Sequence, residues 1–136
     1  MTIVITGATG QLGRLVIESL LDSSVPAGQI VAAGRDVAKV ADLAGRGVQV
    51  RQIDYRDPAS LRQAFAGASK VLLVSGSEVG QRIVQHRNAI EAAKEAGVGL
   101  VVYTSIANAG RTDMQLAAEH EATEEALTTS GLPFTL

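Results

Sequence analysis

The stretch that decides the fold is Ile3-Val4-Ile5-Thr6-Gly7-Ala8-Thr9-Gly10-Gln11-Leu12-Gly13, an apolar strand that ends on a glycine-rich turn and opens a helix. Gly7 lets the chain turn sharply out of the strand, Gly10 lets the backbone approach a phosphate, and Gly13 lets the helix lie close to the sheet. Unpaired N–H groups and the macrodipole at a helix N-terminus both favour negative charge. The stretch therefore predicts a site for the pyrophosphate of a dinucleotide.

The position of these glycines matters more than their number, because glycine is common in this chain and chance matches are easy. They follow a first apolar run and precede a helical stripe formed by Leu12, Leu15, Val16 and Leu20. That context favours a nucleotide site over a merely structural turn between strand and helix. The residues predicted to bind the cofactor here are Thr6, Gly7, Ala8, Thr9, Gly10, Gln11, Leu12 and Gly13.

Length and composition describe one domain, because 136 residues with 46% hydrophobic content suffice for a single buried core. The net charge of −2, with both signs interspersed, and the scarcity of aromatic residues argue against nucleic acid or an anionic membrane as a partner. Cysteine is absent and no His, Asp or Glu grouping has metal-ligand spacing, so we expect neither disulfides nor a metal. Without a basic leader or a membrane-length apolar run, the expected protein is soluble and cytoplasmic, and homo-oligomerisation stays open.

Strand-like and helical runs alternate along the whole chain. Asp57 before Pro58 is an N-cap followed by the preferred first helical residue, and Gly97 and Gly131 stand where helices end. Continuous Val, Ile and Leu strands predict a parallel sheet with both faces covered by helices, and right-handed crossovers favour the Rossmann-type, doubly wound α/β order 3-2-1-4-5-6. The expected strands are 3–6, 30–33, 48–53, 71–75, 100–104 and 132–136, and the expected helices are 11–22, 37–43, 58–65, 79–96 and 113–129.

The last residues, Leu132-Pro133-Phe134-Thr135-Leu136, read as a sixth strand with no terminal helix or polar tail after it. We interpret residues 1–136 as one NAD(P)-binding Rossmann domain that is truncated at its C-terminal end. The expected fragment lacks a C-terminal substrate lobe, which would follow residue 136.

The end of the second strand, Gly34-Arg35-Asp36, bears on the choice of cofactor. A site selective for NAD places a carboxylate here for the ribose hydroxyls, whereas a site selective for NADP needs a cation for the 2′-phosphate. Arg35 is placed to bind that phosphate, and Lys39 adds a second charge one helical turn later. Asp36 either caps the short helix or takes the ribose and permits NAD(H). We expect NADP(H) to be preferred, with NAD(H) and an ordinary surface Arg35 as the alternatives.

Two more strand ends carry polar residues at the carboxyl edge of the sheet, where ligands bind in such folds. Asp54 suits a hydrogen bond near the adenine ring, and the alternative is that it only caps a turn before Tyr55. Ser75, Gly76 and Ser77 end the fourth strand, where Gly76 allows close approach to the cofactor ribose.

Longer stretches resemble the atypical short-chain dehydrogenase/reductases of the NmrA-like group, and within it most resemble the type 2 NAD(P)H:quinone oxidoreductases. The resemblance implies NADPH binding, reduction of a quinone, and a smaller C-terminal substrate region. It also implies that Tyr103, Thr104 and Ser105 belong to the cofactor edge, although Tyr103 also suits the strand core. The stretches that carry it are Thr6-Gly7-Ala8-Thr9-Gly10-Gln11-Leu12-Gly13, Val74-Ser75-Gly76-Ser77-Glu78-Val79-Gly80-Gln81-Arg82, Gln85-His86-Arg87-Asn88, Tyr103-Thr104-Ser105 and Glu119-His120-Glu121-Ala122-Thr123-Glu124.

The usual catalytic pair of that superfamily is missing. Ordinary members use a Tyr and a Lys four residues apart after the fifth strand, and here Leu116 and His120 fall at those positions. Leu116 donates no proton, which disfavours carbonyl–alcohol chemistry. Quinone reduction tolerates the loss because the cofactor carries the chemistry. His120 is the candidate catalytic residue, as a donor to the nicotinamide ribose or a quinone oxygen, or else a half-buried helix residue, and His86 is interpreted as structural.

These observations leave three hypotheses. The first is an NADPH-dependent enzyme that passes hydride to a quinone or a similar electron-poor acceptor. The second is an NmrA-like protein that senses the NADP(H) redox state without turnover, which the missing Tyr keeps open. The third is a structural fragment that lacks the substrate pocket. Fold alone does not separate them.

Overall fold

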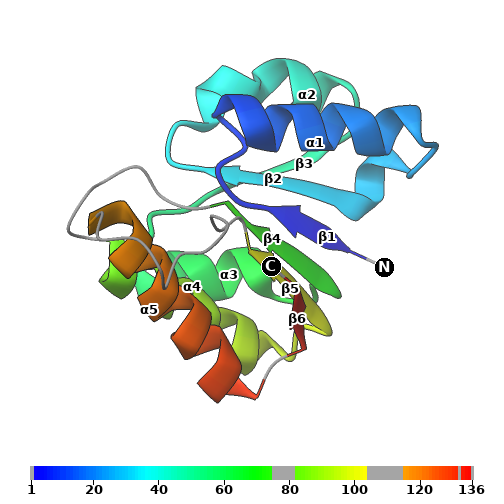
Figure 1. The fold of residues 1–136 in the computed structure, drawn as a ribbon. Helices are drawn as coiled ribbons and strands as arrows, with labels where there is room; N and C mark the ends of the chain where they lie inside the picture. The colour runs from blue at the N-terminus through cyan, green and yellow to red at the C-terminus, as the bar shows by residue number, and fades with distance from the viewer. Residues whose placement is uncertain (1, 75–81, 104–114, 132, 136) are drawn as a thin grey trace.

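The computed structural model describes residues 2–74, 82–103, 115–131 and 133–135 (Figure 1). The strands are β1 (Ile3–Ile5), β2 (Ile30–Gly34), β3 (Gln49–Gln52), β4 (Lys70–Leu73), β5 (Leu100–Tyr103) and β6 (Phe134–Thr135). The α-helices are α1 (Gln11–Asp22), α2 (Ala41–Gly45), α3 (Pro58–Phe65), α4 (Arg82–Ala96) and α5 (Gln115–Ser130). Two 3₁₀ helices, η1 (Ala27–Gln29) and η2 (Val37–Val40), precede β2 and α2.

The strands form one parallel six-stranded sheet in the order β3-β2-β1-β4-β5-β6, which confirms the expected doubly wound topology. The order in which strands are added to the sheet reverses between β1 and β4. Strands β2 and β3 lie on one side of β1, and β4, β5 and β6 lie on the other. In such sheets ligands bind outside the carboxyl ends of the strands at this switch point. The turn after β1 therefore stands where a cofactor is expected.

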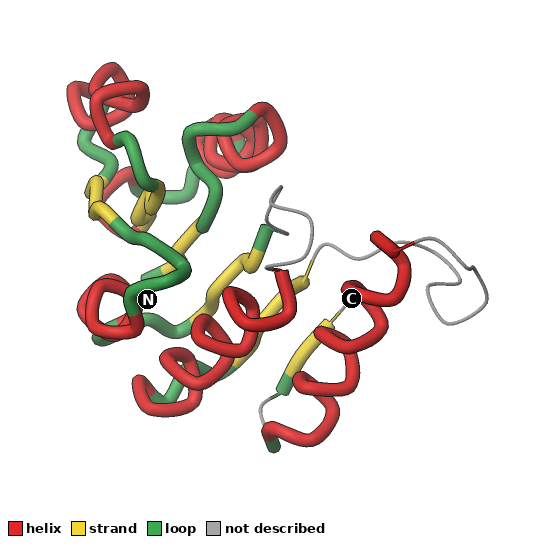
Figure 2. The backbone as a smooth tube through the Cα atoms, turned by 90° about the vertical axis from the view of Figure 1, so that its left-hand side faces the viewer, coloured by secondary structure: helices red, strands yellow, loops and turns green. Residues whose placement is uncertain are grey.

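The two faces of the sheet carry separate apolar clusters. Val4 and Val71 belong to the cluster on the side of α3, α4 and α5, whereas Ile5 and Ala32 belong to the cluster on the side of α1 and α2. This alternation follows from the strand period of two, which sends neighbouring side chains to opposite faces. Figure 2 shows the helices standing on both sides of the strands.

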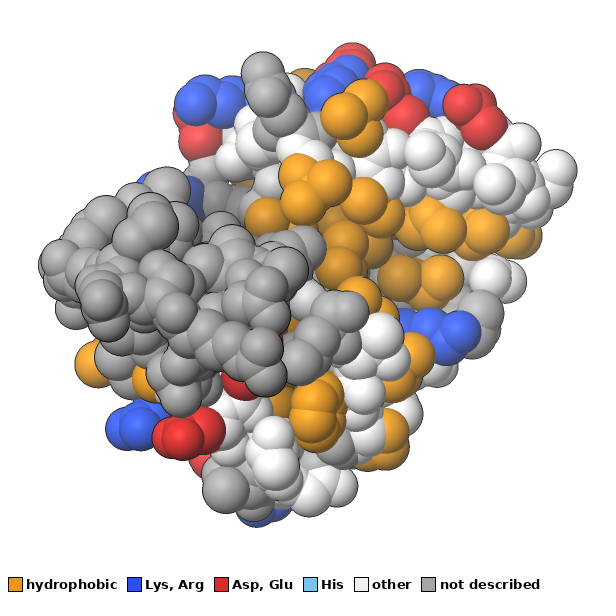
Figure 3. All heavy atoms as spheres, viewed as in Figure 1, with side chains coloured by type: hydrophobic (Ala, Val, Ile, Leu, Met, Phe, Trp, Pro, Cys, Tyr) orange, Lys and Arg blue, Asp and Glu red, His pale blue; other side chains and the backbone are white. Residues whose placement is uncertain are grey.

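Helices stand on both faces of the sheet, as expected, with α1 and α2 on one face and α3, α4 and α5 on the other. Helices α1 and α2 arise from the connections between β1, β2 and β3 (Figure 1). On that face, Leu72 of β4 packs against the cluster under α1 and α2, and Val102 of β5 is half-buried. Figure 3 shows apolar side chains gathered on this side, between α1 and the neighbouring strands.

Element boundaries differ from expectation mainly where short helices adjoin. The helix expected at 37–43 is a 3₁₀ turn over Val37–Val40 followed by the single α-turn Ala41–Gly45. Strand β6 is two residues long, Phe134–Thr135, rather than the expected 132–136, of which 132 and 136 lie outside the described residues. In the part of the chain described, no helix is both long and apolar enough to cross a membrane.

Candidate functional site

Two glycines of the turn after β1, Gly7 and Gly13, occupy positions where a larger residue would be strained or would overlap the backbone. Gly7 has a φ of +63°, in the left-handed region that glycine enters without steric cost, and Gly10 N donates to Gly7 O at 3.0 Å. A Cβ at Gly13 would lie 2.4 Å from Gly7 O and 2.8 Å from Gly7 C. Only glycine at position 13 therefore lets α1 begin so close to the turn.

Gly10 differs from both of these glycines. It is the N-cap of α1, its φ of −90° suits any residue, and no side chain caps the helix there. The nearest described atom to a Cβ at this position would be Gly7 O, at an ordinary contact distance of 3.4 Å. Gly10 is exposed, and the first N–H groups of an α-helix have no partner within the helix.

The other predicted residues of this stretch lie around the turn. Ala8 is fully buried, and its N–H donates to Ala33 O at 3.1 Å. Leu12 is 48% exposed on the first turn of α1. The side chain of Gln11 lies outside the described part of the chain.

The end of β2 meets this turn through Gly34, which the sequence analysis did not single out. A Cβ at Gly34 would lie 2.9 Å from Thr9 Cγ2, so the Thr9 side chain packs directly over the backbone of β2. The signal was present in the sequence, because Gly34 immediately precedes Arg35 at a strand end. The contact itself joins residues 9 and 34, and local spacing does not reveal it.

Arg35 follows Gly34 as an exposed side chain at the carboxyl edge of the sheet. Asp36 is the N-cap of η2, and its carboxylate accepts a hydrogen bond from Ala38 N at 3.2 Å. Of the two roles considered for Asp36, the structure contains the cap. Lys39 is exposed on η2, one turn after Arg35.

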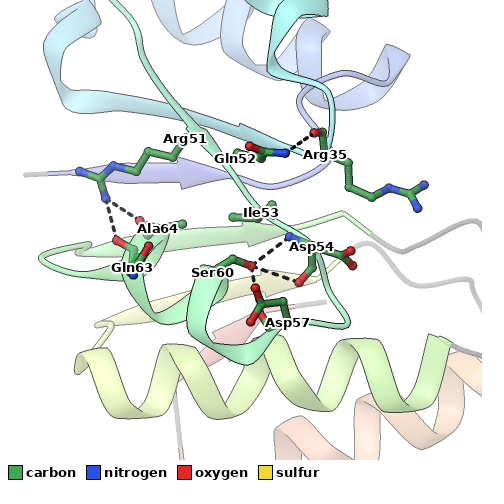
Figure 4. Close-up of a pocket in the computed structure, with 9 residues that line it drawn as sticks. All are labelled: Arg35, Arg51, Gln52, Ile53, Asp54, Asp57, Ser60, Gln63 and Ala64. Atoms are coloured by element: carbon green, nitrogen blue, oxygen red, sulfur yellow. Dashed lines mark hydrogen bonds between the residues drawn. The ribbon is translucent and has the colours of Figure 1, made fainter.

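Beside Arg35 lies a cavity of about 740 Å³ between β3 and α3 (Figure 4). Asp54 and Arg35 contribute to the same end of it (Figure 4). The Asp54 carboxylate accepts from the Arg56 backbone at 2.9 Å and from its guanidinium at 3.2 Å. These bonds, and to a smaller extent the charge of Arg35, lower the pKa of Asp54 and keep it ionised. The lining residues are Arg35, Arg51, Gln52, Ile53, Asp54, Asp57, Ser60, Gln63 and Ala64.

Asp54 thus does cap a turn, which was one of the two roles considered for it. Its backbone is held in addition, because Asp54 N donates to Ser60 Oγ at 3.0 Å and Ser60 Oγ donates to Asp54 O at 3.2 Å. The carboxylate still lines the cavity, so its predicted contact with adenine remains a prediction.

Thr6 is fully buried at the end of β1, and its hydroxyl is taken up by the protein. It donates to Leu72 O at 3.1 Å and accepts from Val74 N at 2.9 Å and from the Tyr55 hydroxyl at 2.7 Å. The Tyr55 hydroxyl also lies 3.0 Å from Val74 O. Any contact of Thr6 with a cofactor is left to its backbone, and Tyr55 joins this site without having been predicted as a site residue.

His86 is a second buried polar residue, next to Tyr55. His86 is fully buried, its ring meets those of Tyr55 and Tyr103 edge to face, and its Nδ1 lies 3.0 Å from Thr123 Oγ1 and 3.4 Å from the Tyr103 hydroxyl. The structural interpretation of His86 agrees with this placement. Tyr103 is 1% exposed, so its side chain belongs to the core and only its backbone is left for the predicted cofactor edge.

Several predicted site residues lie outside the described residues. They are Ser75, Gly76, Ser77, Thr104 and Ser105. His120 and Leu116 lie in α5, where the backbone is described and their side chains are not.

Comparisons with known proteins agree on the type of domain. Residues 7–136 match the model of a family described as NAD(P)H-binding. Quinone oxidoreductase 2 of Escherichia coli K12 is 55% identical over 134 residues, which cover 98% of this chain. The crystal structure of an NADPH-dependent quinone oxidoreductase from E. coli complexed with NADPH superimposes with a TM-score of 0.93 at 54% identity, over 98% of this chain. The Citrobacter sp. triphenylmethane reductase complexed with NADP(H) gives a TM-score of 0.93 at 49% identity, again over 98%.

The chain spans about half the length of the relatives that it matches. It covers 46% of the E. coli quinone oxidoreductase sequence, and 47% of the chain in each of the two solved complexes.

Proposed function

The chain belongs to the NAD(P)H-binding family whose model it matches, and from that membership we propose that it binds the cofactor of an NADPH-dependent oxidoreductase acting on quinones. The reaction transfers a hydride from the reduced nicotinamide to the quinone ring. The quinone takes up a proton as well and leaves as the hydroquinone, and the cofactor leaves oxidised. The names of the E. coli relatives, at 54–55% identity, support this choice of cofactor and acceptor.

The observation that carries the proposal is the contrast between Gly10 and its neighbours in the turn. Gly7 needs glycine for its positive φ, and Gly13 needs it to avoid overlap with Gly7 O. Gly10 has neither need, since its φ is −90° and its nearest described contact would be ordinary. A purely structural turn does not require glycine there, whereas a pyrophosphate that must reach the N–H groups of α1 does.

Preference for NADPH is supported at the next strand end. The carboxylate that would bind the ribose hydroxyls of NAD is engaged in capping η2 through Ala38 N. Arg35 and Lys39 are exposed cations, beside the cavity and on η2. A guanidinium matches a phosphate with two parallel hydrogen bonds, so these charges favour the 2′-phosphate.

The cavity beside Arg35 suits the adenine end of the cofactor. The ionised Asp54 carboxylate is an acceptor for the exocyclic amine of adenine, and Ile53 supplies an apolar wall. The dinucleotide then extends from this cavity across the glycine turn toward the switch point between β1 and β4.

For the reduction itself, the bound cofactor supplies the hydride and the protein orients it. Leu116 stands where a carbonyl reductase would carry its proton-donating Tyr, so the residues of α5 suit an acceptor that needs no strong acid. His120 is proposed to orient the nicotinamide ribose or a quinone oxygen by donating a hydrogen bond.

The proposal is tested by measuring the steady-state rate at which the full-length protein oxidises NADPH with each of a panel of quinones. We expect quinone-dependent turnover, no oxidation of simple secondary alcohols with NADP⁺, and a lower rate without weaker NADPH binding in His120→Ala. Tight NADPH binding with no quinone turnover would replace the enzyme by the redox-sensing alternative.

A further inference from the structure

We propose that Tyr55 is a positioning residue that sets the spacing between the two halves of the cofactor site, the adenine cavity and the glycine turn. This inference rests on the proposed function, because it assumes that one dinucleotide occupies both places. Tyr55 lines neither the cavity nor the turn in the part of the chain described, and it acts through the residues to which it is bonded.

The backbone pairing between β1 and β4 stops just before the glycine turn. Their backbone pairing runs to Ile5 opposite Leu72, and Thr6 N adds one more bond to Leu72 O at 3.0 Å. Beyond Thr6 the chain swings away at Gly7, so the ladder cannot continue to Val74. The Thr6 hydroxyl takes over, since it donates to Leu72 O and accepts from Val74 N.

The Tyr55 phenol lies beside the Thr6 hydroxyl. Tyr55 OH lies 2.7 Å from Thr6 Oγ1 and 3.0 Å from Val74 O, so its single hydrogen is within bonding distance of the residues that follow β1 and β4. With Leu72 and Val74 N, it completes the bonding capacity of the Thr6 hydroxyl. Burial raises the pKa of Tyr55, so the phenol stays protonated and remains a donor.

Val74, which is bonded to the Thr6 hydroxyl, also lies against the glycine turn. A Cβ at Gly7 would lie only 3.1 Å from Val74 Cβ, so the turn packs directly against Val74. A shift of Val74 or Thr6 therefore moves Gly7, and with it the N-terminus of α1 where the pyrophosphate is proposed to bind.

Tyr55 is also linked to the cavity, through the neighbouring residue Asp54. Tyr55 follows Asp54 directly, so the loop that places the Asp54 carboxylate is held at Tyr55. The backbone of Tyr55 is itself fixed, because Asn88 Nδ2 of α4 donates to Tyr55 O at 2.8 Å. One side chain thus ties the adenine end of the site to the pyrophosphate end, across a sequence separation of 49 residues.

The test compares a ligand that spans both halves with one that occupies a single half. In Tyr55→Phe, we expect the Kd of NADPH to rise about five- to tenfold, as for the loss of one or two hydrogen bonds. The Kd of adenosine 2′-monophosphate, which carries no 5′-phosphate and therefore needs only the adenine half, should change less than about twofold. A merely structural role would lower thermal stability and leave the ratio of the two affinities unchanged.

Thr6 provides the matched pair for the same measurement. Thr6→Ser keeps the hydroxyl and should retain the ratio of the wild-type protein, whereas Thr6→Val keeps the shape and should behave as Tyr55→Phe. An unchanged ratio in both Tyr55→Phe and Thr6→Val, measured at low temperature where the variants are folded, would overturn the inference. Should Thr6→Val not fold, Tyr55→Phe alone decides. A wild-type protein that binds neither ligand would instead refute the proposed function.

Discussion

Replacement of Gly10 by valine separates a ligand-binding glycine from a structural one. In the structure, a Cβ at this position would lie 3.4 Å from Gly7 O, and the φ of −90° is open to valine, so the fold has room for the change. The cost to stability is that of a poorer N-cap for α1, about 1 kcal/mol. Gly10→Val should therefore fold and unfold cooperatively at a slightly lower temperature.

The effect on the cofactor should be much larger. The branched side chain would stand over the N–H groups that open α1, where the pyrophosphate must approach. Loss of two charge-assisted hydrogen bonds, at about 1.5–3 kcal/mol each, weakens binding by roughly a hundredfold or more. Isothermal titration of wild-type and variant protein with NADPH measures this loss directly, and thermal unfolding of the same samples verifies the fold.

A matched control is available at Gly45, which is exposed on α2 and would have no described atom within 4 Å of an added Cβ. Gly45→Val should bind NADPH as the wild-type protein does. If Gly10→Val is folded and binds NADPH with wild-type affinity, Gly10 does not face the pyrophosphate and serves only as part of a structural turn.

Three further predictions concern other parts of the site. Arg35→Ala should lose about 1.5–3 kcal/mol of NADPH affinity with little change for NADH, and equal losses for both cofactors in titrations would remove Arg35 from the 2′-phosphate. Gly13→Ala should destabilise the protein by about 1–3 kcal/mol in denaturant unfolding, because its Cβ would overlap Gly7 O at 2.4 Å, and an unchanged midpoint would contradict that overlap. The pKa of Asp54 is lowered from 3.8, mainly by Arg56, so the stability it contributes is full above that value and is lost as the pH falls below it. Asp54→Asn should accordingly show a shallower loss of stability below about pH 4 than the wild-type protein in urea titrations across pH, and parallel curves would count against the pairing.

Local patterns were enough to predict the elements and their order. The alternation of apolar runs with helical stripes, together with caps such as Asp57-Pro58, depends on residues a few positions apart. The order 3-2-1-4-5-6 then follows from right-handed crossovers, which hold for parallel sheets in general.

The site divides in the same way. The sequence by itself determined that a glycine turn opens a helix after the first strand, that a cation follows the second strand, and that no Tyr stands at position 116, since each is a property of neighbouring residues. Only the tertiary structure decided that a side chain fits at Gly10 and not at Gly13. It also decided that the Asp36 carboxylate caps η2 and that the Thr9 side chain packs over Gly34. Tyr55 illustrates the reason most clearly, because its hydroxyl meets Thr6 across 49 residues of chain. Such a contact arises when the ends of separate strands meet at one edge of the sheet, and no periodicity or spacing in the sequence encodes it.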